Sequence, residues 1–285
     1  MSEKVAIVTD STAYLEPGEA KKLGVHVVPL SIQLSGEKFL EGIEIDSDEL
    51  LRRLSYGASY PISVAPDLAV FEKLYAELHQ QTDQILAVHV SGRLSKTAQR
   101  SEMGAEAFLG RCTIEVIDSM TTSVGLGILV RAAATAANEG ASLDDIVRLV
   151  RGMIPHIYLV FYVETMDYLE RSGRIGKAQA VLGSMLKIKP ILFMEDGDII
   201  PLEKVRTTEK AIEKLFEFVA EFDNLEQTAI IQCDKYPNKD ARMLQERLGQ
   251  SFPNLDFPII QYGPELATRV GPNALGIVVY EGMTF

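Results

Sequence analysis

Short apolar runs alternate with helical stretches through the first half of the chain, and this alternation limits the possible folds more than any other feature. The strand-sized runs are residues 5–8, 25–30, 84–90 and 113–118, and the predicted helices are residues 16–23, 67–79, 96–109 and 123–138. Strands that alternate with helices are typical of a parallel sheet with helices packed on it. The sequence therefore predicts an N-terminal α/β domain with a mostly parallel sheet flanked by helices.

One segment of this first half departs from the alternation. Residues 31–45 alternate apolar and polar side chains around Ser35-Gly36, which predicts a β-hairpin. Asp46 or Ser47 is placed to cap a helix that runs to residue 54. The proline-bounded residues 56–66 that follow are predicted to form a loop.

The second half of the chain is predicted to be a separate domain, since 285 residues are enough for about two domains of typical size. A capped helix at 142–151 runs into the breakers Gly152-Met153-Ile154-Pro155, where we place the boundary. The strands predicted beyond it are residues 157–163, 187–194, 199–204, 227–232 and 276–279, with helices near 208–220 and 239–250. Glu195-Asp196-Gly197-Asp198 is typical of a hairpin turn. We therefore expect residues 1–154 to form the first domain, and residues 155–285 a second α/β domain with a mixed or antiparallel sheet.

Composition and charge exclude several classes of protein. A content of 47% hydrophobic and 24% charged residues is that of a globular chain, neither disordered nor fibrous. The formal net charge of −12 gives no general attraction to nucleic acid or anionic lipid, so neither is expected as a partner. No apolar run approaches the roughly 20 residues of a membrane span. Because the first residues also lack the order of a signal peptide, we expect a cytoplasmic protein.

The familiar catalytic patterns are missing from the sequence. It contains no Gly-x4-Gly-Lys-Ser/Thr phosphate loop, no complete dinucleotide fingerprint and no Gly-x-Ser-x-Gly elbow. The four histidines stand singly, and Cys112 and Cys233 lie in apolar contexts, so neither a metal site nor a disulfide is expected. A triad of Ser95, His89 and Asp118 can be drawn, but a chain of this composition allows such combinations by chance.

Polar turns follow three of the predicted parallel strands. They are Thr9-Asp10-Ser11-Thr12, residues 91–97 and residues 118–123. The carboxyl ends of strands in an open α/β sheet meet where ligands bind. Each turn also precedes a helix, so that its N–H groups and hydroxyls can hold an anionic oxygen. The alternative is that these residues only cap helices, and the sequence leaves both interpretations open.

Two further clusters lie in the second half. Residues 166–176 contain the polar turn Ser172-Gly173-Arg174 and lead into an apolar helical stretch with small residues at 177–185. Small residues on an apolar helix allow either close helix packing or space for an apolar guest. The second cluster, residues 262–276, contains two Gly-Pro pairs and is too stiff and polar for a strand interior.

Taken in order, these segments resemble the DegV family of bacterial fatty-acid-binding proteins over nearly the whole chain. The matching segments are Thr9-Asp10-Ser11-Thr12, Ser63-Val64-Ala65-Pro66, Leu94-Ser95-Lys96-Thr97, Asp118-Ser119 with Gly125 and Gly127, Ser172-Gly173-Arg174-Ile175, Lys204-Val205-Arg206-Thr207 and Arg269-Val270-Gly271-Pro272-Asn273. No single motif is specific, but seven motifs in one order are.

The resemblance implies a two-domain α/β protein that encloses one long-chain fatty acid, such as palmitate, and presents its carboxylate to a separate fatty acid kinase subunit for acyl phosphate formation. It implies a lipid carrier that is not an enzyme, with no catalytic residues and no cofactor besides the bound lipid. A carboxylate taken from water needs hydrogen-bond donors, so Ser63 and Ser95 are expected to bind it. Arg174, Arg206 and Arg269 are candidate contacts for the head group, a phosphate or the kinase.

The chain departs from the family's motifs at two charged positions. Arg269 replaces a histidine, and its permanent cation is able to pair with the carboxylate directly. Lys96 replaces a glycine and is either a second cation near the head group or a solvent-facing side chain. Two other hypotheses remain open at this point: an enzyme acting on a small phosphorylated metabolite held by the same turns and arginines, and a plain interaction module.

Overall fold

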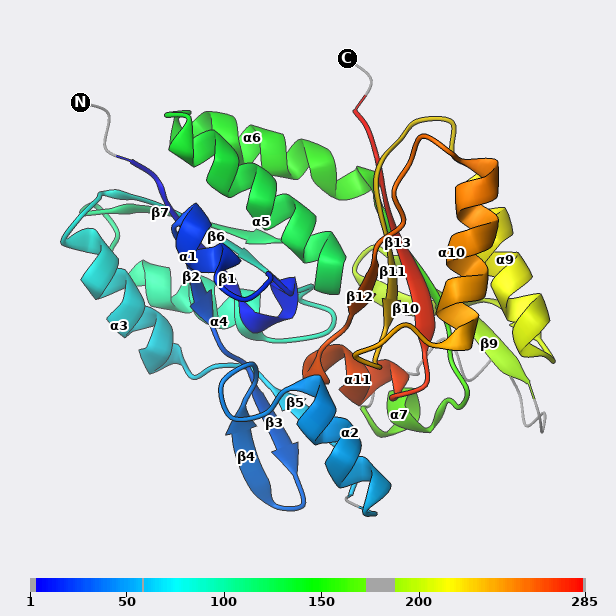
Figure 1. Ribbon diagram of the computed structural model, residues 1–285. Helices are drawn as coiled ribbons and strands as arrows, with labels where there is room; N and C mark the ends of the chain where they lie inside the picture. The colour runs from blue at the N-terminus through cyan, green and yellow to red at the C-terminus, as the bar shows by residue number, and fades with distance from the viewer. Residues whose placement is uncertain (1–3, 58, 173–187, 284–285) are drawn as a thin grey trace.

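The computed structural model describes residues 4–57, 59–172 and 188–283. Within these residues the chain forms a four-stranded, a six-stranded and a three-stranded sheet (Figure 1). The strands are β1 Ala6–Asp10, β2 Val25–Val28, β3 Ser31–Leu34, β4 Glu37–Leu40, β5 Ile62–Val64, β6 Gln84–His89, β7 Thr113–Asp118, β8 Ile157–Tyr162, β9 Lys189–Glu195, β10 Asp198–Val205, β11 Leu225–Gln232, β12 Ile259–Gln261 and β13 Leu275–Glu281. The helices are η1 Ser11–Ala13, α1 Glu19–Leu23, α2 Ser47–Ser55, α3 Leu68–His79, α4 Thr97–Glu106, α5 Ser123–Asn138, α6 Leu143–Met153, η2 Ile154–His156, α7 Asp167–Arg171, α9 Thr208–Ala220, α10 Lys239–Ser251 and α11 Pro264–Val270.

The four-stranded sheet has the order β2-β1-β6-β7, and all its neighbouring strands run parallel. Helices cover both of its faces, so its central strands are apolar on both sides. Val8 of β1 packs in one cluster with Phe71 of α3, whereas Ile7 packs in another with Leu126 of α5. The predicted N-terminal parallel sheet flanked by helices is confirmed.

The six-stranded sheet has the order β10-β9-β8-β13-β11-β12, in which β11 and β12 are parallel and the other neighbours antiparallel. The predicted mixed sheet is confirmed, including the hairpin turn at Asp196-Gly197, where both residues have positive φ. Alternate side chains of β8 face different layers. Leu159 belongs to the cluster around α5, and Val160 to the cluster beneath α9 and α10. The apolar cluster around α5 is therefore shared by both large sheets.

The small sheet has the order β4-β3-β5 and includes the predicted hairpin of residues 31–45. The prediction that residues 56–66 form a loop is wrong in part, because β5 lies inside that segment. Ser63 of β5 pairs with Ile32 of β3 in antiparallel register. A three-residue strand between prolines has no periodicity of its own, and the neighbouring strand β3 provides its hydrogen bonds.

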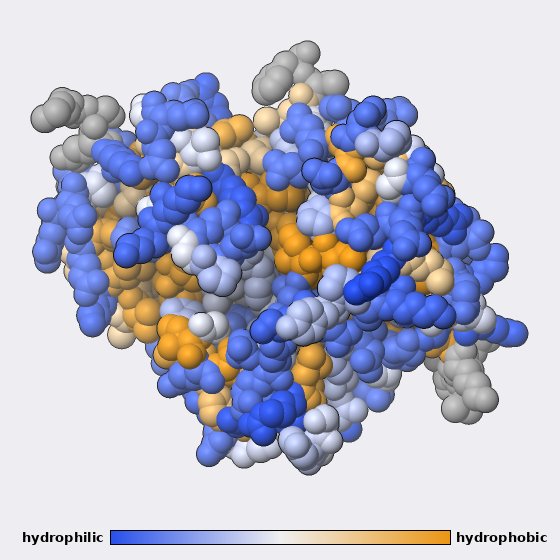
Figure 2. Space-filling view, viewed as in Figure 1, coloured by the Kyte–Doolittle hydropathy of each residue, from blue (hydrophilic) through white to orange (hydrophobic). Residues whose placement is uncertain are grey.

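The Gly-Pro segment at residues 262–276 contains the helix α11, which the sequence did not predict. Pro264 occupies the first turn, where the missing N–H costs nothing, and Gly271 ends the helix with φ +80°. All seven residues of α11 are buried, and the helix packs against α2, α7 and β5. It therefore lies where the small sheet meets the six-stranded sheet (Figure 1). On the face shown in Figure 2 the outer residues are mostly hydrophilic, and apolar side chains show mainly near the middle and on the left side of the view.

Candidate functional site

The turns after β1, β6 and β7 lie together at one edge of the parallel sheet. Asp10 accepts a hydrogen bond from the N–H of Val90 (2.9 Å), and the N–H of Ser91 donates to the carbonyl of Thr121 (2.9 Å). The hydroxyl of Ser91 donates to the carbonyl of Gly197 in the β9–β10 turn (2.7 Å). This edge of the parallel sheet is thereby tied to the six-stranded sheet.

Side-chain capping explains only the first of these turns. Asp10 caps η1 by accepting a hydrogen bond from the N–H of Thr12, but α4 and α5 begin without a side-chain cap. The hydroxyls of Thr121, Thr122 and Ser123 are buried and have no hydrogen-bond partner within the described part of the chain. The polar side chains at the start of α5 therefore do not cap this helix.

Ser63, Ser95 and Arg269 come from three elements that converge: β5, the turn before α4, and α11. The Oγ of Ser63 is buried and has no hydrogen-bond partner among the described residues. Ser95 is 5% exposed, and its Oγ lies 2.8 Å from Oγ1 of Thr97. Arg269 is 4% exposed and donates from Nη2 to the carbonyl of Leu94, the residue before Ser95 (2.6 Å). The helix that carries Arg269, α11, also packs against β5, the strand that carries Ser63.

Glu265, one helical turn before Arg269 in α11, forms an ion pair with the guanidinium of Arg269. Its Nε and Nη2 lie 2.7 and 2.6 Å from Oε1 of Glu265. Glu265 is 0% exposed, and its Oε2 has no partner among the residues that the structure describes. Glu265 thus keeps one acceptor oxygen with unused hydrogen-bonding capacity.

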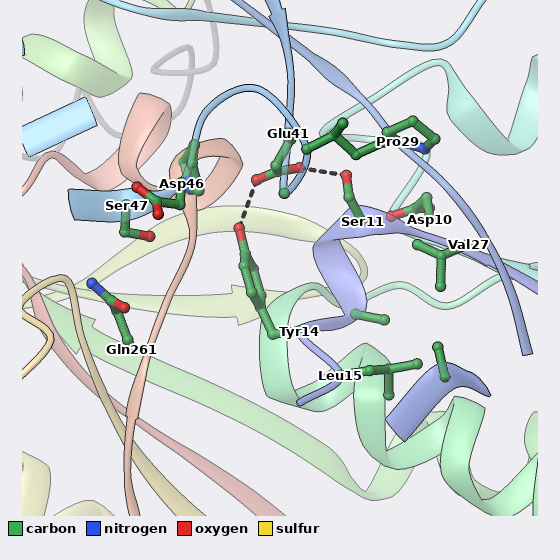
Figure 3. Close-up of a pocket in the computed structure, with 15 residues that line it drawn as sticks. Asp10, Ser11, Tyr14, Leu15, Val27, Pro29, Glu41, Asp46, Ser47 and Gln261 are labelled. Carbon is green, nitrogen blue, oxygen red and sulfur yellow. Dashed lines mark hydrogen bonds between the residues drawn. The ribbon is translucent and has the colours of Figure 1, made fainter. Parts of the chain in front are cut away.

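A second buried acid, Glu41, contacts the start of α11. Its Oε1 accepts hydrogen bonds from the N–H of Glu265 and the hydroxyl of Tyr14, both at 2.7 Å. Its Oε2 accepts from the hydroxyl of Ser11 at 2.5 Å (Figure 3). Burial and the negative charge of Glu265 raise the pKa of Glu41 from 4.5 to about 7, although the three hydrogen bonds act in the opposite direction.

A pocket of about 430 Å³ opens beside Glu41 (Figure 3). Its apolar wall includes Leu15, Val27 and Pro29, and its polar wall includes Asp46 and Gln261. No lysine or arginine is among its described lining residues. Neither Ser63 nor Ser95 lines it, so this pocket is distinct from the predicted head-group site.

The triad drawn from the sequence with Ser95, His89 and Asp118 is not present. His89 instead lies 3.0 Å from Asp10 through Nδ1 and 2.9 Å from Ser101 through Nε2. The distances resemble those of an Asp-His-Ser triad, but all three side chains have zero exposure. This buried network of hydrogen bonds joins β1, β6 and α4 within the core.

The remaining candidate residues lie outside this junction or outside the described residues. Lys96 and Arg206 are exposed, and Arg174 lies outside the described residues. Neither cysteine forms a disulfide. In the described ranges, no three His, Cys, Asp or Glu side chains are grouped so as to hold a metal ion. The same ranges contain no helix long and apolar enough to cross a membrane.

The sequence did not single out Glu41 or Glu265 as functional residues. Glu265 follows Gly263-Pro264 and is indistinguishable in sequence from an ordinary acid in the first turn of a surface helix. Glu41 follows a short exposed strand. Only the packing of α11 against the small sheet shows that both acids are buried, so no local pattern was able to reveal them.

The fold and this junction define a class: an α/β protein with a parallel and a mixed sheet joined at a buried polar site. The family model described as "Uncharacterised protein, DegV family" matches residues 4–282. A DegV domain-containing protein of Halalkalibacterium halodurans is 34% identical over 283 residues, which cover 97% of this chain and 98% of that protein. The chain therefore belongs to the DegV family, as its ordered motifs predicted.

Two similar solved structures carry printed descriptions of binding. A DegV family protein from Thermus thermophilus, described as showing fatty acid binding, is 30% identical with a TM-score of 0.88, covering 98% of this chain and 100% of that chain. DegV of Bacillus subtilis, described as a fatty acid binding protein, is 28% identical with a TM-score of 0.87 and the same coverage.

Proposed function

We propose that this protein binds a long-chain fatty acid, with the carboxylate held by the hydroxyls of Ser63 and Ser95 beside Arg269. The observation that carries the proposal is the buried Oγ of Ser63, which has no partner among the described residues. A buried hydroxyl without a partner is costly unless a ligand or water completes it. The two solved relatives described as binding fatty acids support this choice of ligand.

The chemistry of the junction suits a carboxylate. Hydroxyls donate to carboxylate oxygens, and the guanidinium of Arg269 lies close to Ser95, because it donates to the carbonyl of the preceding residue, Leu94. A buried carboxylate needs such donors, because an unpaired charge is strongly disfavoured in an apolar interior. Arg269 would thus provide the positive charge that compensates the carboxylate, as we expected from the sequence.

The acyl chain would extend into the apolar cluster next to the junction. Leu94, Leu169 and Val270 are almost fully buried members of this cluster. Each buried methylene is worth about 0.8 kcal/mol, so roughly 14 methylenes supply about 11 kcal/mol before ordering costs are subtracted. This is enough for tight binding of a palmitate-sized chain.

We further propose that the protein is a carrier without catalytic activity of its own, which presents the carboxylate to a separate fatty acid kinase subunit. The family resemblance suggests this partner. The exposed cations Lys96 and Arg206 are the described candidates for contact with the kinase or its phosphate, and Arg174 remains a third. The alternative of an enzyme for a phosphorylated metabolite is less well supported, because the two similar solved structures are described as binding fatty acids.

Native mass spectrometry tests the ligand directly. Protein purified from bacteria is expected to carry one added mass of a long-chain fatty acid, which disappears when the protein is denatured. A second measurement adds palmitate or oleate to delipidated protein. Protein that is empty as purified and takes up neither acid would contradict the proposal, whereas uptake of a small phosphate ester instead would favour the enzyme.

The double variant Ser63→Ala, Ser95→Ala tests the head-group assignment. Each lost hydrogen bond to a charged group is worth about 1 to 3 kcal/mol, so the affinity for palmitate should fall by about tenfold or more. Ser251→Ala, at the end of α10, is the matched control and should bind like the parent. Unchanged affinity of the double variant would place the carboxylate elsewhere.

A further inference from the structure

The junction beside the proposed carboxylate site contains more buried acids than buried bases. Glu41 and Glu265 are 2% and 0% exposed, and they are linked by the N–H of Glu265. Arg269 is the cation that pairs with Glu265, and within the described residues Glu41 has no ion pair. A fatty acid would bring a third carboxylate to a site with one guanidinium.

We propose that Glu41 is the proton acceptor of this site, so that a fatty acid binds together with a proton taken up by Glu41. This rests on the proposed fatty acid function. When a ligand carboxylate engages Arg269, the guanidinium neutralises Glu265 less completely. The repulsion between the carboxylates of Glu265 and Glu41 then increases, and a proton on Glu41 relieves it.

The surroundings of Glu41 can accommodate that proton. The hydroxyl oxygen of Ser11, which also accepts the N–H of Leu30 (3.0 Å), lies against Oε2 and is able to accept a hydrogen bond from a protonated carboxyl. Tyr14 and the N–H of Glu265 still donate to Oε1. Protonation therefore leaves both oxygens of Glu41 with a partner, and the hydroxyl hydrogen of Ser11, which lines the pocket beside Glu41, then turns towards that pocket.

The other charged and titratable groups around Glu41 are mostly acidic. They are Asp10 on β1, Tyr14 after η1, Glu44, Asp46 and Asp48 around the start of α2, and Glu265 and Arg269 on α11. Asp10 is in turn hydrogen-bonded to His89, and Tyr14 interacts electrostatically with Cys233. The cations described next to them are Arg269, which pairs with Glu265, and Lys235, whose Nζ lies 3.6 Å from Oδ2 of Asp48. In the unliganded protein Glu41 already has a pKa of about 7. It therefore gains or loses its proton near neutral pH, where coupling between proton uptake and ligand binding can be measured.

The direction of the effect follows from linkage. A ligand that favours protonated Glu41 binds more tightly where Glu41 holds its proton, so affinity falls as the pH rises above about 7. For charges about 10 Å apart in a medium of effective dielectric about 20, the interaction corresponds to roughly a tenfold change in affinity. We therefore expect about tenfold weaker binding near pH 8.5 than near pH 6.

Calorimetric titration with dodecanoate tests the coupling, since this shorter fatty acid is soluble. Titrations near pH 7.5 in two buffers of different ionisation enthalpy should reveal net proton uptake, and the affinity should show the fall with pH. Glu41→Gln, which mimics the protonated acid, should abolish both effects. Glu44→Gln, an exposed acid in the same loop, is the matched control and should keep both. The neutral ligand 1-dodecanol should bind the parent with no pH dependence.

The outcomes separate the two proposals. Binding of dodecanoate with no proton uptake and equal affinity at both pH values would overturn the role of Glu41. Equal pH dependence in the parent and a folded Glu41→Gln would also overturn it. Failure of dodecanoate and palmitate to bind at any pH would instead overturn the fatty acid function. If Glu41→Gln does not fold, the two-buffer measurement on the parent still decides.

Discussion

At the scale of single residues, the junction depends on an ion pair that is almost completely removed from water. Arg269 neutralises Glu265 and also occupies the carbonyl of Leu94. Removing one partner of a buried pair leaves an uncompensated charge, whereas removing both leaves none. The arginine, which we propose as a ligand-binding residue, is therefore also important for the structure.

We expect Arg269→Met to lower the free energy of unfolding by about 3 to 5 kcal/mol at neutral pH. The double variant Arg269→Met, Glu265→Met should lose much less than the two single changes combined. Urea denaturation followed by circular dichroism measures both. Arg148→Met, which breaks a mostly exposed pair with Asp145, should cost less than about 1 kcal/mol. Equal losses for the two arginine variants would show that the buried pair is not important for stability.

Glu41 should also make stability depend on pH. Its pKa is about 7 in the folded protein and near 4.5 when unfolded, so the folded state holds the extra proton between these values. Its contribution is fully present below pH 4.5 and is lost as the pH rises towards and through 7, by up to about 3 kcal/mol. Urea titrations at pH 5 and pH 8 should show Glu41→Gln losing less stability than the parent over this interval. Parallel behaviour of the two proteins would contradict the raised pKa.

At the scale of elements, helices with strong local signals were predictable from sequence. Asp46 and Ser142 cap α2 and α6 with their side chains, and the apolar strands of the parallel sheet fall where predicted. The elements missed were β5, α7, β12 and α11, which have three to seven residues. Such short segments gain their order from packing against other elements, and local sequence contains little information about that packing.

The end of α11 illustrates this dependence. Gly271 has φ +80°, and a Cβ there would lie 2.8 Å from the ring of Tyr168. Gly271→Ala should therefore destabilise the protein by about 1 to 3 kcal/mol, measured as a lower melting temperature. Gly249 in α10 has no neighbouring atom in the way, so Gly249→Ala should be neutral or stabilising by up to about 1 kcal/mol. A harmless Gly271→Ala would mean that the helix end adjusts freely.

At the scale of the whole molecule, the site combines segments that lie far apart in the chain. Glu41 and Glu265 are separated by 224 positions, yet they share a hydrogen bond. The ordered motifs allowed the family and the polar turns to be predicted. They contained no information on the pairing of the acids, because that pairing arises only when the small sheet docks on α11. The roles of Ser63 and Ser95 stay predictions derived from the family resemblance and the chemistry of their hydroxyls.

A crystal structure of the protein with bound palmitate tests the central claim most directly. We predict that the carboxylate lies within hydrogen-bonding distance of Oγ of both Ser63 and Ser95, beside Arg269, with the acyl chain buried among Leu94, Leu169 and Val270. A carboxylate found in the pocket next to Glu41 and Asp46, or an acyl chain on the surface, would contradict the account.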